Sequence, residues 1–173
     1  MANFTVDEFV SQTIAWAASR RDRFRYNFPV KGGWEAWIQV DLCAFILARN
    51  STYDILREQG IFTTPAKRAD LLLNAQLAAV QRIPVEMKSE SFENHGNFVG
   101  GVSADLAKIG NERTPAYSQS SCVNLAVAFS PGNLNAVLAL QPAGHRVFKS
   151  IWQSDEVAVC AAVWTYPGGW VAS

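Results

Sequence analysis

Three charged residues lie at the ends of two short apolar runs in the middle of the chain. Asp70 opens the first run, and Glu86 and Lys88 close the second. Side chains of a strand alternate between its two faces, so Glu86 and Lys88 point one way and Met87 points the other. If the two runs pair as a hairpin, two carboxylates and an ammonium share one solvated corner. Such a corner can hold a hard divalent cation and an attacking water, which is the chemistry of phosphodiester hydrolysis.

Two helices are expected before these strands. The first, residues 5–19, begins with a threonine followed three positions later by a glutamate, the pattern of a capping box. The second, residues 33–48, has apolar residues at spacings of three and four. Glu35 and Gln39 share one face of this second helix, beside the apolar stripe. This arrangement suits a helix that packs on a sheet and borders a polar site.

The remaining pattern predicts one α/β (α+β) domain with a mixed central sheet flanked by helices. After residues 53–58, which are ambiguous, we expect strands over 69–74 and 83–88, a loop over 89–101, a helix over 102–109, a strand over 123–130, a helix over 133–140, and β structure over 146–152 and 156–166. The domain therefore divides into a helical N-terminal part (1–60), a site-bearing hairpin (68–90) and C-terminal strands and helices (100–173).

Composition limits the classes of function. Of 173 residues, 49% are hydrophobic and the formal net charge is zero, which predicts a sizeable core and argues against binding DNA by bulk charge. Basic side chains still gather locally, at Arg20, Arg21, Arg23 and Arg25. No apolar run reaches the length of a membrane span, and no signal peptide is evident, so we expect no membrane partner. The expected location is cytoplasmic. Export by a route that needs no classical signal peptide is the alternative.

The order and spacing of these charged residues resemble the PD-(D/E)xK nuclease superfamily, whose fold is called restriction-endonuclease-like. The resemblance covers residues 34–129 by order of elements and rests on Asp70, Glu86 and Lys88, with Glu35 as a weaker match. It implies that all four are catalytic. It also implies an Mg²⁺ ion, or Mn²⁺ in its place, held by Asp70, Glu86 and the main-chain carbonyl of Met87. Lys88 would orient or deprotonate the attacking water.

The resemblance implies a metal-dependent endonuclease that acts on DNA in preference to RNA, as a toxin or a defence component. A toxin would need an immunity protein that covers the Asp70–Glu86 cleft. One alternative is a catalytically inactive domain of the same fold that binds a protein or nucleic-acid partner, as an inhibitor or immunity protein does. Another is that the Glu86-x-Lys88 match is coincidental. His95, in the loop after Lys88, is either a general acid or without a role, and the second is favoured.

Overall fold

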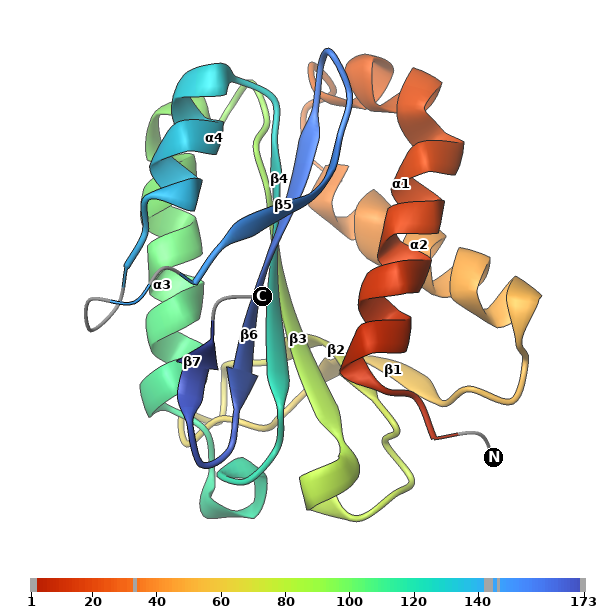
Figure 1. Cartoon of the computed structure of the whole chain (residues 1–173), viewed down its shortest axis with the longest axis vertical. Helices are drawn as coiled ribbons and strands as arrows, with labels where there is room; N and C mark the ends of the chain where they lie inside the picture. The colour runs from red at the N-terminus through yellow and green to blue at the C-terminus, as the bar shows by residue number, and fades with distance from the viewer. Residues whose placement is uncertain (1–2, 33, 142–144, 146, 172–173) are drawn as a thin grey trace.

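The structure, a computed structural model, describes residues 3–32, 34–141, 145 and 147–171. Its centre is a seven-stranded, mostly antiparallel sheet in the order β1-β2-β3-β4-β6-β5, with β7 paired to β6 off this path (Figure 1). The strands are β1 (Ile55–Gln59), β2 (Ala69–Leu73), β3 (Ile83–Ser89), β4 (Cys122–Ala128), β5 (Lys149–Gln153), β6 (Ala158–Thr165) and β7 (Gly169–Val171). The expected mixed α/β sheet is thereby confirmed.

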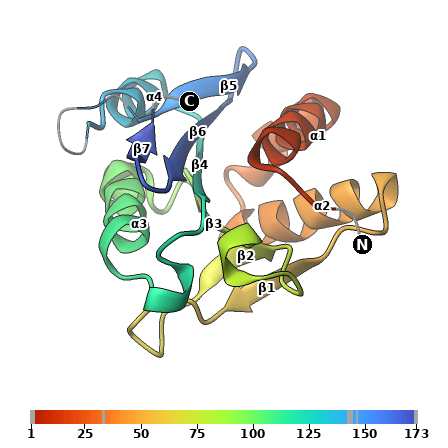
Figure 2. The ribbon, with the colours of Figure 1, turned by 60° about the horizontal axis from the view of Figure 1, so that its bottom comes forward.

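Helices cover both faces of the sheet (Figure 2). On one face lie α1 (Val6–Asn27) and α2 (Trp34–Arg49), which share a large apolar core with β2, β3, β4 and β6. On the other lie α3 (Phe98–Asn111) and α4 (Pro131–Leu138), which enclose a second core with β4 and β6. Within the described residues, none of these helices has the length and apolarity needed to cross a bilayer.

Helix α1 begins where the sequence predicts and ends later. Thr5 and Glu8 form the expected capping box, in which each side chain accepts from the other's backbone N–H. The helix then continues through the arginine-rich stretch to Asn27, beyond the predicted end at residue 19. Arg20 donates twice to Asp41 of α2, with Nε 2.6 Å from Oδ2. This fork ties the two helices together and supports the additional turns.

Three further elements differ from the prediction. The ambiguous residues before the hairpin form β1, so the N-terminal part is not wholly helical. Only the two end residues of β1 are half-buried, so its sequence shows little alternation of apolar and polar residues. Helix α3 starts at Phe98 instead of residue 102, across two glycines that favour a loop. A Cβ on Gly101 would lie 3.3 Å from Lys88 Cδ, so the glycine lets α3 approach β3 closely. The short β7 was not predicted. Gly33 and Arg146, within predicted elements, lie outside the described residues.

Strand β3 extends beyond its pairing with β2, and this positions the site. Its antiparallel pairing with β2 ends at Leu71 and Val85. Its parallel pairing with β4 runs on from Val85 to Ser89. The last residues of β3 therefore have a hydrogen-bonded strand on one side only. On the other side, a notch remains between β2, β3 and the start of α2.

Candidate active site

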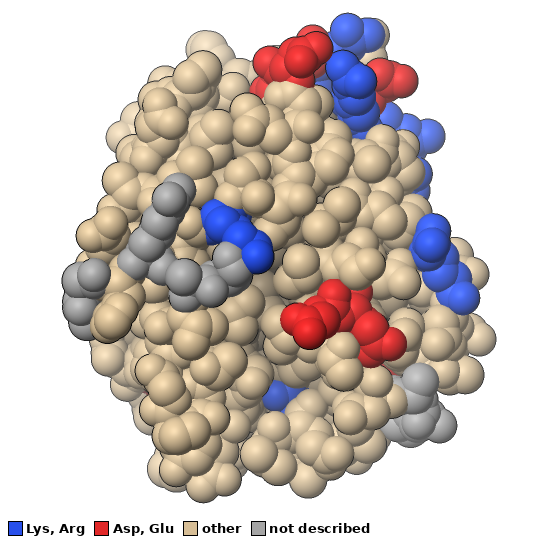
Figure 3. Space-filling view, viewed as in Figure 1, with Lys and Arg blue, Asp and Glu red and all other residues tan. Residues whose placement is uncertain are grey.

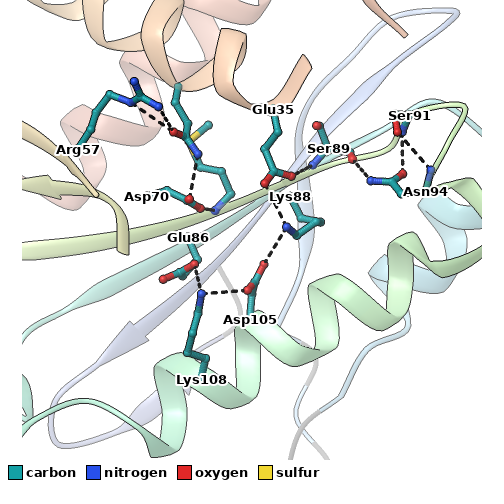
Figure 4. A network of polar contacts seen from close by, with 12 residues as sticks. Glu35, Arg57, Asp70, Glu86, Lys88, Ser89, Ser91, Asn94, Asp105 and Lys108 are labelled. Atoms are coloured by element: carbon teal, nitrogen blue, oxygen red, sulfur yellow. Dashed lines mark hydrogen bonds and ion pairs between the residues drawn. The ribbon is translucent and has the colours of Figure 1, made fainter. Parts of the chain in front are cut away.

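A cluster of six ionisable side chains fills this notch and the adjoining face under α3 (Figure 4). We call it the acid–lysine cluster, and it consists of Glu35 from α2, Asp70 from β2, Glu86 and Lys88 from β3, and Asp105 and Lys108 from α3. The structure thus brings together all four side chains that the sequence singled out. The roles assigned to them remain predictions.

Two acids of the cluster cap the free edge of β3. The Met87 backbone N–H donates to Asp70 Oδ2 at 2.6 Å, and the Ser89 N–H donates to Glu35 Oε2 at 3.1 Å. Donors at alternate positions of a strand edge need partners when they are buried, and here two carboxylates replace the missing strand. The Met87 side chain, as expected, is buried in the core on the α1–α2 face.

The two lysines alternate with the acids to form a chain of ion pairs. Lys88 Nζ lies 3.1 Å from Glu35 Oε1 and 3.8 Å from Asp105 Oδ2. Lys108 Nζ lies 3.2 Å from Asp105 Oδ1 and 2.6 Å from Glu86 Oε2. The contacts of Glu86 and Lys88 with α3 show that their side chains share one face of β3, as the alternation predicts.

The pKa values show that two buried acids of the cluster resist ionisation. Burial, opposed by the Met87 hydrogen bond, raises the pKa of Asp70 to about 7. Burial, together with the charge of Asp70, raises the pKa of Glu86 to about 8, against the effect of Lys108. Burial lowers the pKa of Lys88, but the carboxylates of Glu35 and Asp105 outweigh it and leave that pKa raised. The lysines therefore stay charged while Asp70 and Glu86 resist ionisation.

The side chains of the cluster offer oxygen atoms of the kind that hard divalent cations prefer. Four acids and two lysines leave two negative charges when all are ionised, and carboxylate oxygens are the ligands that Mg²⁺ prefers. Glu86 Oε1 is buried without a hydrogen-bond partner, so it is available as a ligand. Among the described residues, however, no three His, Cys, Asp or Glu side chains are arranged to hold a metal by themselves. An ion here would also need main-chain or water oxygens.

Three further residues belong to this site. Asp105 and Lys108 have the spacing of a solvated ion pair on a helix surface, yet their side chains are only 12% and 17% exposed. Gln39 lies one turn after Glu35 on α2. In the structure Gln39 is buried, donates to Asp70 Oδ1 at 2.9 Å and accepts from Arg57 at 2.6 Å. Their spacing alone carries no signal, because the packing of α2 and α3 on β3 brings them to the site.

His95 lies outside the acid–lysine cluster. Its Nδ1 contacts Glu90 Oε1 at 2.5 Å. Glu90 is fully buried and also accepts from the backbone N–H groups of Phe129 and Ser130. This group ties the end of β3 to the start of α4, which agrees with a structural setting for His95.

A cavity of about 230 Å³ opens beside Glu35 and Lys88, walled by residues of the α1–α2 connection and of the loop after β3. A larger one, of about 490 Å³, lies on the other side of α3, between Gly110 and the edge-to-face pair Trp164 and Trp170. The smaller cavity is the relevant one, because it alone of the two touches the acid–lysine cluster. It gives a solvent-side approach to Lys88.

The arginines near the end of α1 are mostly paired with acids. Arg21 contacts Asp155 and Arg25 contacts Glu156, both in the β5–β6 turn. The mixed blue and red atoms at the top of Figure 3 lie over this region. The basic run therefore does not form a purely positive patch for phosphates.

Comparisons of the chain with family models, with curated proteins and with solved structures find no match in any of the three.

Proposed function

We propose that this chain is a divalent-metal-dependent nuclease of the PD-(D/E)xK type, acting on DNA in preference to RNA. The observation that carries the proposal is the convergence of Asp70, Glu86 and Lys88, on two adjacent strands, with Glu35 from the preceding helix. The excess of buried carboxylate over lysine adds support, since it creates a site that a divalent cation would neutralise.

The arrangement of elements also favours the restriction-endonuclease-like fold that the sequence motif implies. A helix bearing Glu35 comes first, and an antiparallel pair bearing Asp70 and Glu86 follows it. Helix α3 then crosses over to β4, which runs parallel to β3. In this fold, as in the chain, the strand with the acid pairs antiparallel with the strand that carries Glu-x-Lys.

Each residue then has a definable task. Asp70, Glu86 and the Met87 carbonyl would hold Mg²⁺ or Mn²⁺, which supplies charge neutralisation and a more acidic bound water. Lys88 orients the attacking water and stabilises negative charge that develops on the phosphate. Glu35 keeps the Lys88 ammonium in place through their 3.1 Å contact. Lys108, whose side chain is mostly buried, supplies a second positive charge facing the phosphates.

The direct test incubates the purified chain with plasmid DNA and with RNA, in Mg²⁺, Mn²⁺ or EDTA, from pH 6 to 9. We expect cleavage of DNA that EDTA abolishes. The Glu86→Gln variant should be inactive, and Glu112→Gln should retain activity. Glu112 is a suitable control because it also pairs with a lysine, Lys67, in an exposed ion pair apart from the cluster. Absence of cleavage by the parent under all conditions would reject the nuclease proposal.

One observation favours the alternative of a binding domain. Both lysines of the cluster are paired with acids, and Asp70 and Glu35 cap the β3 edge, so the cluster also serves as a structural network. A binding domain, such as an inhibitor or immunity protein, would retain these contacts and lack cleavage. Stable binding of nucleic acid or of a partner protein by a chain that never cleaves would support it.

A further inference from the structure

Asn124 is a buried polar residue in the middle of β4 whose side chain has no hydrogen-bond partner. It is 0% exposed, and neither Oδ1 nor Nδ2 bonds to any described residue. Three other residues of β4 share its face, namely Cys122, Ala126 and Ala128, and the two alanines pack in the α3–α4 core. An unpaired buried amide destabilises the folded state, and an apolar residue would avoid that cost. Core packing alone therefore does not explain an asparagine at this position.

Its neighbour across the sheet is Glu86. The two residues are register partners in the parallel β3–β4 pairing, and neighbouring strands lie about 4.8 Å apart. Both side chains lie on the α3 face, since Glu86 contacts Lys108 there. Glu86 Oε2 has Lys108 as its partner, whereas Oε1 has none. An unused N–H donor and an unused carboxylate acceptor are therefore adjacent in one buried layer.

We infer that Asn124 is a positioning residue for Glu86. In the cation-bound protein its Nδ2 group donates a hydrogen bond to Glu86 Oε1 and fixes the rotation of the carboxylate. The bond uses one lone pair of Oε1 and leaves the other for the ion, so Glu86 keeps this oxygen as a metal ligand. The inference rests on the proposed metal-dependent function and extends it to a strand that the sequence motif does not include.

If Asn124 positions Glu86, replacing it should change metal affinity without lowering the stability of the metal-free protein. Outer partners that orient a metal-binding side chain are typically worth about 10- to 100-fold in metal affinity or activity. An orphaned amide contributes little to folding, and replacement by an apolar side chain of similar size is neutral or stabilising. Asn124→Leu should therefore weaken metal binding while leaving the melting temperature in EDTA unchanged or higher. A residue needed only for packing would not give this combination.

The experiment measures Mg²⁺ and Mn²⁺ binding by calorimetry, melting temperature in EDTA, and the metal concentration needed for half-maximal DNA cleavage. Three variants are compared with the parent. Asn124→Leu removes the amide, and Asn124→Ser keeps a shorter hydrogen-bond donor. Thr13→Val is the matched control, because Thr13 is equally buried, its hydroxyl is bonded within α1, and it lies away from the cluster.

We expect about tenfold weaker metal binding or more for Asn124→Leu, an intermediate loss for Asn124→Ser, and parent affinity for Thr13→Val. Parent-like metal affinity in a folded Asn124→Leu protein, or in Asn124→Ser if the leucine variant does not fold, would overturn the inference while leaving the nuclease proposal intact. A parent that binds neither metal and cleaves nothing would instead refute the proposed function, and the role of Asn124 would fall with it.

Discussion

The Met87 backbone N–H donates to Asp70 Oδ2 at 2.6 Å, just past the point where β2 stops pairing with β3. A side chain here takes the place of a strand. The same contact keeps the Asp70 carboxylate beside Glu86, and burial together with the charge of Asp70 raises the pKa of Glu86. The notch therefore lies where β2 stops pairing with β3, and the Asp70 carboxylate both lines the notch and caps the edge of β3.

Glu86→Gln and Lys88→Ala should each abolish nucleic-acid cleavage. Both groups would act on charge that develops in the transition state, and loss of one such group typically costs about 10²- to 10³-fold in rate, or ~2.7–4 kcal/mol of barrier. Initial rates on plasmid DNA measure the effect, and circular dichroism must match the parent. Cleavage that survives in the double variant would point to another site or to a contaminant.

Glu35→Gln should reduce cleavage less than Glu86→Gln does. Its amide oxygen can still accept from the Ser89 N–H, but the charge that faces Lys88 is lost. The comparison of rates at saturating metal separates two roles for Glu35. A loss equal to that of Glu86→Gln would mean that Glu35 is itself a metal ligand and not a holder of Lys88.

Mg²⁺ or Mn²⁺ should raise the melting temperature. Two acids that resist ionisation gain a counter-ion, and ligand at about 100 times its Kd stabilises the folded state by ~2.7 kcal/mol. Asp70→Asn should show a smaller shift, which thermal denaturation with and without metal will measure. Equal shifts in both proteins would show that the ion binds elsewhere.

Stability of the metal-free protein should fall as pH rises from about 4 to about 8. The pKa values of Asp70 and Glu86 are raised from 3.8 and 4.5 to about 7 and about 8, so in this window the folded chain holds protons that the unfolded chain has released. The unfolded state then binds fewer protons, and the free energy of unfolding decreases with pH. Urea titrations in EDTA should show this slope, and Glu86→Gln should flatten it.

Glu90→Ala should destabilise the fold by an amount on the order of 3 kcal/mol, because the Phe129 and Ser130 N–H groups lose a buried charged acceptor. His95→Ala should have a much smaller effect on both stability and cleavage, since Glu90 keeps its other donors. Chemical denaturation of the two variants makes the comparison. A large loss of cleavage in a folded His95→Ala protein would restore the general-acid hypothesis.

Much of the fold follows from local signals in the sequence. The capping box at Thr5, the apolar spacing of α2 and the apolar runs of β2, β3 and β4 were sufficient to predict those elements. The start of α3 was missed because Gly100 and Gly101 oppose a helix locally, while the contact with Lys88 favours it. Tertiary packing decides such positions, and propensity does not.

The site was predictable only in part. Alternation along β3 placed Glu86 and Lys88 on one face. Asp70 was predicted because it opens the apolar run that precedes β3. Asn124 gave no signal, because its neighbours form a continuous apolar run. Only the register of β4 against β3 shows that it lies beside Glu86.

Because carboxylates cap the edge of β3, two of its backbone amides should respond to ligand binding in the notch. Amide protons of Met87 and Ser89 are held by the Asp70 and Glu35 carboxylates instead of by carbonyls of a neighbouring strand. Any ligand that draws on those carboxylates must alter the amides' chemical shifts and their exchange with solvent. Two NMR resonances, read without substrate or mutation, would therefore record the occupancy of the notch.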